Sequence, residues 1–325
     1  MSALLLFGAG LALLIFAAEL IVRHGSSLAL ALGMNPLVLG LTIVAIGTSA
    51  PELAVGITAS LGGSGALAVG NIAGTNLVNI LLILGLSALL RPLPLHLRTI
   101  RVDLPMMVVA ALLMTALAWD GVLSLRDGIT MLLVAAAYTT VLIRQSRGEG
   151  ARVKKEFREM FGPEGARTPG TDESHMGINA LYLAAGLALS VLGAHWLVGA
   201  AVDMARSFGM GEAVIGLTIV AIGTSAPELV TTIVGTLRNE RDVAVGNLLG
   251  SSIYNILVIL GIPSLIAPGG IPVERELLLF DIPLMTAVAL LCIPVFISGR
   301  DVSRVEGGSF VALYLGYLAY LLLLR

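Results

Sequence analysis

Two glutamates, Glu52 and Glu228, occupy the same place in a segment that the chain contains twice. The fourteen residues from Gly40 to Leu53 recur letter for letter from Gly216 to Leu229, 176 positions later. Each copy lies in an apolar stretch and ends in Thr-Ser-Ala-Pro-Glu-Leu. A charged side chain at the centre of a membrane costs roughly 2.5 to 3.5 kcal/mol or more, so that such residues mark functional sites. The repeat therefore predicts two carboxylates that hold a cation inside a membrane.

A proline precedes each glutamate and is expected to break the surrounding helix. Pro51 and Pro227 lack a backbone N–H and clash with the preceding turn, which would free carbonyls near Ala45 and Ala221 from the helical ladder. Freed carbonyls at membrane depth must line a cavity or bind an ion. Hydroxyl groups four residues before the glutamates, on the same helical face, belong to Thr48 and Thr224.

A second repeated segment supplies more oxygen atoms. The sequence from Gly70 to Gly85 matches that from Gly246 to Gly261, with nine identical positions of sixteen. Carboxylates, hydroxyls, amides and carbonyls form an all-oxygen set that suits a hard cation and could supply the six to eight ligands of calcium. The set contains no histidine or cysteine, which argues against zinc or copper. The polar pairs of this second segment, again four residues apart, are Thr75 with Asn79 and Ser251 with Asn255.

Two simpler interpretations apply to individual residues. Serine, threonine and asparagine in membrane spans often only hold helices together by hydrogen bonds, and this alternative stays open for Thr75, Asn79, Ser251 and Asn255. It does not explain the glutamates, because such bonds do not require an ionisable group. The lone cysteine, Cys292, is expected to be a small core residue.

The elements that carry these residues must be membrane helices. Hydrophobic residues make up 57% of the chain and charged residues 12%, with a mean hydropathy of +0.97. Too little polar surface remains for a soluble protein, so we expect an all-α integral membrane protein. Ten stretches are long enough to cross a ~30 Å hydrocarbon core. They cover residues 3–22, 36–60, 66–90, 103–119, 127–143, 178–205, 212–236, 243–267, 279–297 and 306–324.

The repeats divide the chain into two halves of five spans. Residues 1–143 would form the first repeat and residues 178–325 the second. Because five is odd, the second half would enter the membrane from the opposite side, which gives inverted-topology repeats with broken helices at the ion site. Residues 144–177 are polar and predict a cytoplasmic connector loop, with a short helix around residues 153–161.

Basic residues indicate the orientation. With the N-terminus outside, fifteen of the nineteen lysines and arginines fall in inside loops, which favours both termini outside and residues 144–177 in the cytoplasm. The first span is not expected to be a signal peptide, because it lacks a basic leading region and contains Glu19. We expect a multi-pass protein of the cell inner (plasma) membrane, with lipid around it and no nucleic acid or obligatory protein partner.

The duplicated motifs carry a family resemblance. Two copies of G-T-S-A-P-E, each followed by G-N-x-x-G-[TS]-x-x-x-N, resemble the repeats of the cation/calcium exchanger superfamily, in its prokaryotic sodium/calcium antiporter branch. The resemblance implies ten helices, with the second, third, seventh and eighth around the ions and the first and sixth sliding across them. It also implies that Glu52 and Glu228 are the central calcium carboxylates. The other implied ligands are Thr48, Ser49, Thr75, Asn79, Thr224, Ser225, Ser251, Asn255 and the carbonyls of Ala45 and Ala221.

Asn255 departs from the pattern, since relatives usually carry aspartate at the equivalent position. The resemblance implies a secondary active antiporter that exchanges sodium for calcium by alternating access and normally exports calcium, without a cofactor. A proton- or potassium-coupled exchanger on the same scaffold stays open, as does a calcium-permeable channel. An enzyme is not expected, because the chain lacks H-E-x-x-H, G-x-S-x-G and any Ser/His/Asp set at membrane depth.

Overall fold

The computed structural model describes residues 3–32, 34–165, 173–208 and 221–324 of the chain and is almost entirely helical. Eight helices in these ranges are long and apolar enough to cross a membrane, or nine if one bent pair counts as a span. An all-helical, multi-pass architecture is therefore confirmed. The predicted seventh span begins in residues 212–220, outside the described ranges.

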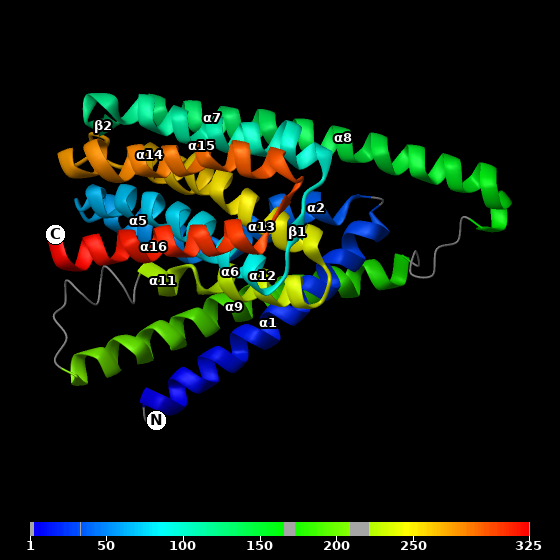
Figure 1. Cartoon of the computed structure of the whole chain (residues 1–325), viewed down its shortest axis with the longest axis horizontal. Helices are drawn as coiled ribbons and strands as arrows, with labels where there is room; N and C mark the ends of the chain where they lie inside the picture. Colours follow the sequence, from blue (N-terminus) through cyan, green and yellow to red (C-terminus); the bar gives the residue numbers. More distant parts are fainter. Residues whose placement is uncertain (1–2, 33, 166–172, 209–220, 325) are drawn as a thin grey trace.

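The first half of the chain runs through one broken span and four continuous ones. Most of them lie side by side in the bundle of Figure 1. Its elements are α1 (Ala3–Ala31), α2 (Pro36–Leu39), η1 (Gly40–Val44), α3 (Ala45–Thr48), α4 (Ala50–Leu61), α5 (Gly65–Leu77), η2 (Val78–Leu84), α6 (Gly85–Leu90), β1 (Leu93–Pro94), η3 (Thr99–Asp103), α7 (Leu104–Leu117), η4 (Ala118–Asp120), β2 (Val122–Leu123) and α8 (Leu125–Gly165).

The second half repeats this order where it is described. Its elements are α9 (Glu173–Ser207), α11 (Ala221–Thr224), α12 (Ala226–Leu237), α13 (Arg241–Tyr254), η6 (Asn255–Leu260), α14 (Gly261–Ile266), β3 (Ile271–Pro272), η7 (Leu277–Asp281), α15 (Ile282–Ser298), β4 (Asp301–Val302) and α16 (Arg304–Leu324).

A break interrupts the helix in both copies of the Thr-Ser-Ala-Pro-Glu motif. Ser49 separates α3 from α4, and Pro36–Thr48 is bent by 45° from Ala50–Leu61. Ser225 separates α11 from α12 with nearly the same backbone angles, φ −83° and ψ 9° against −82° and 14°. In each case the proline occupies the first turn of the new helix, where its missing N–H costs nothing. The predicted broken helices are confirmed in both copies.

The continuous span Arg241–Ile266 forms the centre of the bundle, because 94% of its most apolar 18-residue stretch is buried. Glycines let it approach the second span closely: a Cβ on Gly246 would lie 2.6 Å from the carbonyl oxygen of Leu37, and one on Gly250 would lie 2.5 Å from that of Leu41. Small residues at such positions allow membrane helices to pack backbone against backbone. The second copy of the G-N-x-x-G motif thereby brings α13 against the broken span of the first repeat.

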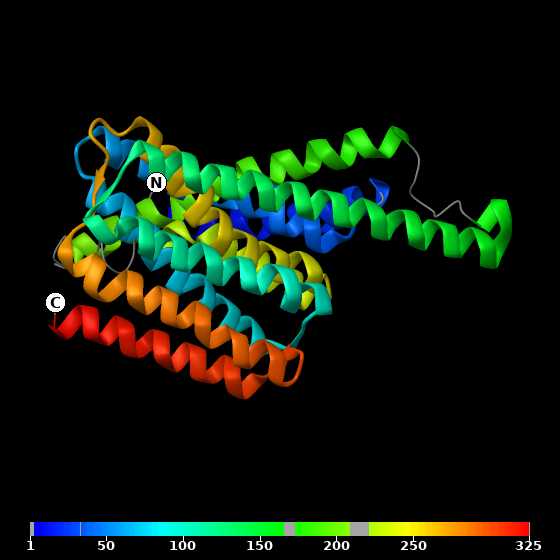
Figure 2. The ribbon, with the colours of Figure 1, turned by 90° about the horizontal axis from the view of Figure 1, so that it is seen from above.

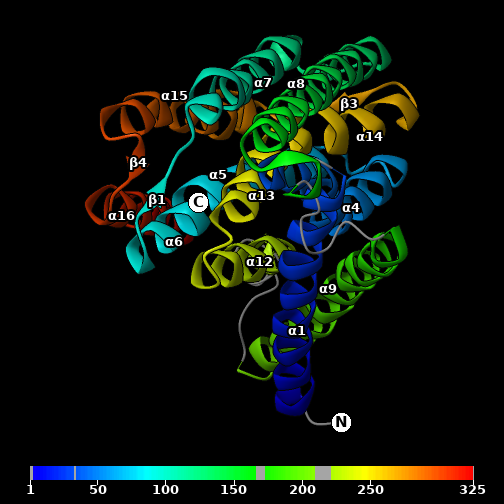
Figure 3. The same ribbon diagram turned by 90° about the vertical axis from the view of Figure 1, so that its right-hand side faces the viewer.

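Helices α1 and α9 pack along each other as a pair at the margin of the bundle, as Figure 3 shows. A Cβ on Gly10 would lie 2.7 Å from the backbone nitrogen of Leu197, and one on Gly193 would lie 3.1 Å from the carbonyl oxygen of Gly10. An ion pair joins this pair to the bundle, from Arg238 Nε to Glu19 Oε2 at 2.9 Å.

Two short strand pairs join loops from different halves. Strand β1 pairs antiparallel with β4, and β2 pairs antiparallel with β3. In Figure 1 the labels of β1 and β2 lie toward opposite ends of the bundle.

The connector differs from its predicted form. A short helix around residues 153–161 was expected between polar loops, whereas α8 runs without interruption from Leu125 to Gly165 and extends beyond the bundle in Figure 2. The sequence after residue 143 is rich in arginine, lysine and glutamate, which are good helix formers and extend an existing helix without a new nucleation step. Residues 166–172 lie outside the described ranges.

Candidate cation site

The two glutamates lie where the helix breaks place them. Glu52 is in the first turn of α4 and Glu228 in the first turn of α12, and both side chains are fully buried. They are close enough to act on each other electrostatically. Two like charges in a buried place repel each other and are poorly solvated, so that a stable arrangement requires a compensating cation or protons.

Each carboxylate lies against the helix break of the other half. The Ser49 hydroxyl donates to Glu228 Oε1 at 2.9 Å, and the Thr48 hydroxyl also lies against Glu228. In the other direction, the Thr224 hydroxyl lies against Glu52. Thr48 and Ser49 therefore face Glu228, and Thr224 faces Glu52, an arrangement that sequence spacing alone could not show.

Several buried oxygen atoms around the glutamates have no hydrogen-bond partner in the described structure. Buried polar atoms are nearly always satisfied, so that a group of exceptions requires an explanation such as an ion. Oxygen predominates in the group, as hard cations prefer. Its members are both carboxylate oxygens of Glu52, Oε2 of Glu228, the hydroxyls of Thr75 and Ser225, and the side-chain amides of Asn79 and Asn255.

Ser251 joins the group from α13. Its hydroxyl lies 3.5 Å from the hydroxyl of Ser49 and 3.5 Å from the carbonyl oxygen of Ala45. Asn79 and Asn255 are both fully buried and each belongs to a π-helical segment, η2 and η6, which widens the helix locally.

The expected freeing of the Ala45 carbonyl is wrong. This carbonyl accepts from the backbone N–H of Ser49 at 3.2 Å and from the Thr48 hydroxyl at 3.2 Å. The missing N–H of Pro51 affects the carbonyl four residues before it, which is that of Gly47. Ala221 is the first described residue of α11, and its predicted role stays a prediction.

Sequence reasoning missed Asn247 and Thr232. Thr48 donates to Asn247 Oδ1 at 3.1 Å, and Asn247 Nδ2 donates to the Thr232 hydroxyl oxygen at 3.3 Å, with all three side chains fully buried. A signal for Asn247 was present, because an asparagine follows the first glycine in both copies of G-N-x-x-G. Thr232 has no polar counterpart in the first repeat, so that the repeat gave no indication of it.

Two acidic residues at helix starts, Asp103 and Asp281, are buried and hydrogen-bonded to tyrosines. In the structure, Asp103 Oδ1 accepts from the Tyr138 hydroxyl at 3.0 Å and Asp281 Oδ1 accepts from the Tyr317 hydroxyl at 3.0 Å. These contacts tie neighbouring spans together away from the cation site.

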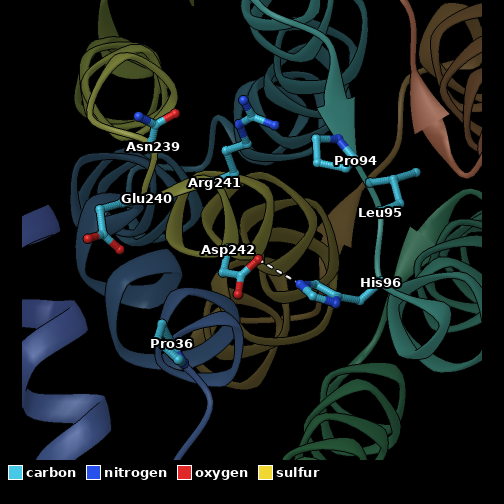
Figure 4. A pocket seen from close by; sticks show the side chains of 8 residues that line it. All are labelled: Pro36, Pro94, Leu95, His96, Asn239, Glu240, Arg241 and Asp242. Atoms are coloured by element: carbon cyan, nitrogen blue, oxygen red, sulfur yellow. Dashed lines mark hydrogen bonds and ion pairs between the residues drawn. The ribbon is translucent and has the colours of Figure 1, made fainter.

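A separate surface pocket lies where α2 and α13 begin, with a volume of about 350 Å³. Its lining includes a hydrogen-bonded contact between His96 Nε2 and Asp242 Oδ1 at 2.9 Å, together with Glu240 and Arg241 (Figure 4). None of the predicted cation ligands lines it.

Within the described ranges, no three histidine, cysteine, aspartate or glutamate side chains gather as a metal cluster. The candidate site combines two carboxylates with hydroxyls and amides, an oxygen-rich set of the kind that hard cations prefer.

Comparison with known proteins agrees with this chemistry. The family model described as sodium/calcium exchanger protein matches residues 2–144 and 178–323, which is nearly the whole chain. The chain belongs to the sodium/calcium exchanger family. The two matched segments also leave out residues 145–177, the region of the predicted connector.

Relatives cover almost the full length of this exchanger-family chain. The inner membrane protein YrbG of Escherichia coli is 36% identical over 290 residues, 87% of this chain and 86% of the relative. The putative antiporter CaxA of Alkalimonas amylolytica is 36% identical over 311 residues, 95% of each chain. The sodium/calcium exchanger MaX1 of Methanosarcina acetivorans is 32% identical over 345 residues, covering 97% of this chain and 96% of the relative.

The fold of this family member also matches a solved structure. The sodium-calcium exchanger NCX_Mj superposes with a TM-score of 0.82 at 26% identity, over 98% of this chain and 99% of that chain. The resemblance inferred from the repeated motifs is thereby confirmed.

Proposed function

We propose that the protein is a secondary active antiporter that exchanges sodium for calcium across a cell inner membrane. The observation that carries this proposal is the pair of fully buried glutamates, each set against the other repeat's helix break and surrounded by unpartnered oxygen atoms. One calcium or several sodium ions would compete for this group. Without a cation the carboxylates would be buried unpaired, so the protein with an empty site would not readily switch from facing one side of the membrane to facing the other.

The proposed scaffold is a pair of inverted five-helix repeats with ten spans. The cross-paired strands support it: β1 pairs with β4, and their sequence counterparts β3 and β2 pair with each other. Such reciprocal pairing is expected when two similar halves are related by a two-fold axis in the membrane plane. The distribution of basic residues places both termini outside and residues 144–177 in the cytoplasm.

Alternating access would come from the α1–α9 pair. These helices pack closely on each other through glycines and contact the bundle mainly along α12 and α2. A pair that moves as one body past the broken helices would expose the glutamates to one side and then the other.

Energetics favour three sodium ions per calcium. With ~100 mV inside-negative and a 10⁴-fold inward calcium gradient, exporting one calcium costs about 5.6 kcal/mol chemically and about 4.6 electrically. With a tenfold sodium gradient, two sodium ions supply roughly 7.4 kcal/mol and three roughly 11.1 on the same basis. Under these conditions only three suffice, even though Asn255 leaves two glutamates as the carboxylates of the predicted ligand set.

Radiocalcium uptake tests the proposal. Purified protein in sodium-loaded liposomes is diluted into sodium-free buffer, beside potassium-loaded liposomes and the Glu52→Gln and Glu228→Gln variants. We expect uptake only with internal sodium, and a loss of at least tenfold in either variant, because each removes half the charge that holds calcium.

Each alternative has its own outcome in this assay. Uptake driven by a proton gradient without sodium would replace sodium coupling with proton coupling. A requirement for potassium beside sodium would indicate a potassium-dependent exchanger, and unitary currents would indicate a channel. Full transport by normally folded glutamate variants would contradict the assignment of the site.

A further inference from the structure

Asn247 differs from the other asparagines near the cation site. Both amides of Asn79 and Asn255 are buried without hydrogen-bond partners, as expected of atoms that await a cation. The amide of Asn247 is engaged at both ends: its Oδ1 accepts from Thr48 at 3.1 Å and its Nδ2 donates to Thr232 at 3.3 Å. Asn247 thus differs from the candidate ligands, because each of its polar atoms already has a protein partner.

The Asn247 amide orients the hydroxyl of Thr48, one of the predicted ligands. A hydroxyl carries one proton and two lone pairs. The proton of Thr48 is directed at Asn247 Oδ1 and at the Ala45 carbonyl oxygen, which lies 3.2 Å away. Its lone pairs are then free to face a cation held between the carboxylates. An amide turned the other way would donate to Thr48 and occupy one of these lone pairs.

Thr232 completes the arrangement from α12. It lies one helical turn after Glu228 and its hydroxyl oxygen accepts from Asn247 Nδ2. Loss of this acceptor would leave one end of a fully buried amide unsatisfied in either orientation, which is costly in a dry environment. Buried groups behind the ligands commonly fix ligand orientation in this way.

The arrangement exists in one half only. The position that corresponds to Thr232 in the first repeat is occupied by Gly56, which has no side chain to offer. Consistent with this, Nδ2 of Asn71, the counterpart of Asn247, has no partner in the described structure. The two halves of the cation site are therefore supported differently, although their ligands are alike.

We propose that Asn247 and Thr232 are positioning residues, which strengthen cation binding by holding the Thr48 hydroxyl with its lone pairs toward the site. This inference rests on the proposed function, in which Thr48 is a ligand. It predicts that a change at Thr232 affects cation affinity only through Thr48.

The test compares three threonine variants on α12. Thr232→Val removes the acceptor with almost no change of shape, Thr232→Ser restores it, and Thr236→Val is the control. Thr236 is equally buried, and its hydroxyl bonds only the carbonyl of Thr232, at 2.8 Å. We expect Thr232→Val to raise the KM for calcium about 3- to 10-fold with little change in maximal rate, as one buried hydrogen bond implies. Thr232→Ser and Thr236→Val should stay within twofold of the parent protein.

A double-variant cycle separates positioning from a purely structural role. In a Thr48→Val background, Thr232→Val should have no further effect on calcium affinity, because the group through which it acts is gone. An unchanged KM in Thr232→Val, or a full additional effect in the Thr48→Val background, would overturn the proposal. If Thr232→Val fails to fold, Thr232→Ala carries the same expectation.

A binding measurement keeps the two proposals distinct. The increase in Tm caused by calcium in purified protein reports affinity without any transport. Absence of sodium-driven uptake in the parent protein would contradict the antiport proposal alone. A normal calcium-induced Tm shift in Thr232→Val would contradict the positioning role alone.

Discussion

At the scale of single residues, the two glutamates are distinguished by burial without a fixed partner. Both carboxylate oxygens of Glu52 are buried without a hydrogen-bond partner in the described structure, and Glu228 accepts from Ser49 through Oε1 only. By comparison, the buried Asp103 accepts from the Tyr138 hydroxyl through one oxygen. A free, buried carboxylate is expensive unless a cation or a proton neutralises it.

Protons should therefore compete with calcium. Calcium binds the ionised carboxylates, so that affinity is greatest at high pH and is lost as the pH falls and protons occupy the same oxygens. We expect calcium binding, measured by isothermal titration calorimetry on purified protein, to weaken at least tenfold between pH 8 and pH 5. The Thr236→Val protein should show the same profile as the parent. Binding that stayed constant over this range would contradict the role of both glutamates.

At the scale of elements, the close approach of the second span to α13 decides the geometry of the site. Gly250 is next to the ligand Ser251, and a Cβ there would lie 2.5 Å from the Leu41 carbonyl oxygen and 2.7 Å from Ala45 Cβ. Neither backbone can yield without moving Ser49 relative to Ser251. The glycine is thus part of the site although it contributes no ligand.

Gly250→Ala should accordingly abolish transport. Forcing these helices apart typically costs 1–3 kcal/mol and moves ligands by more than a cation tolerates. We expect a lower Tm and at least a tenfold loss of sodium-driven calcium uptake. The matched control is Gly316→Ala in α16, where no described atom lies within 4 Å of the added Cβ. This control should keep normal uptake, and equal behaviour of the two variants would refute the argument from packing.

At the scale of the whole molecule, α1 and α9 stand apart from the rest of the bundle (Figure 3). The ion pair between Glu19 of α1 and Arg238 at the end of α12 is partly exposed, with 34% of the Glu19 side chain and 63% of the Arg238 side chain accessible to solvent. Exposed ion pairs contribute little stability. This ion pair can therefore break and reform during a transport cycle, whereas the glycine contacts between α1 and α9 hold those two helices together.

A covalent link between the positions of Glu19 and Arg238 should stop transport. We would place cysteines at Glu19 and Arg238 in a Cys292→Ala background and join them with a bifunctional maleimide. Uptake should fall to background, because α1 could no longer move along α12. The same double variant treated with a monofunctional maleimide should retain uptake. Undiminished uptake by fully linked protein would show that α1 does not move relative to α12.

The sequence by itself predicted long apolar spans, the helix breaks and the candidate ligands. Long apolar stretches must be helical in a membrane, the proline of each repeated motif stands in the first turn of a new helix, and a duplicated glutamate in such a stretch has few other uses. These are local properties, so that Glu52, Glu228 and their neighbouring hydroxyls could be recognised from spacing alone. The uninterrupted course of α8 was missed, because charge and glycine indicate a loop as readily as an exposed helix.

Only the tertiary structure decided which residues face each other. It placed Ser49 against Glu228 and joined Thr48 to Asn247 and Thr232, across nearly two hundred positions of sequence. Such contacts depend on how two halves pack, and packing is set by shape at positions such as Gly250 rather than by any repeating pattern. The repeat indicated two equal half-sites. The fold makes them unequal, because Asn247 donates to Thr232 in the second half and the corresponding position of the first half is Gly56.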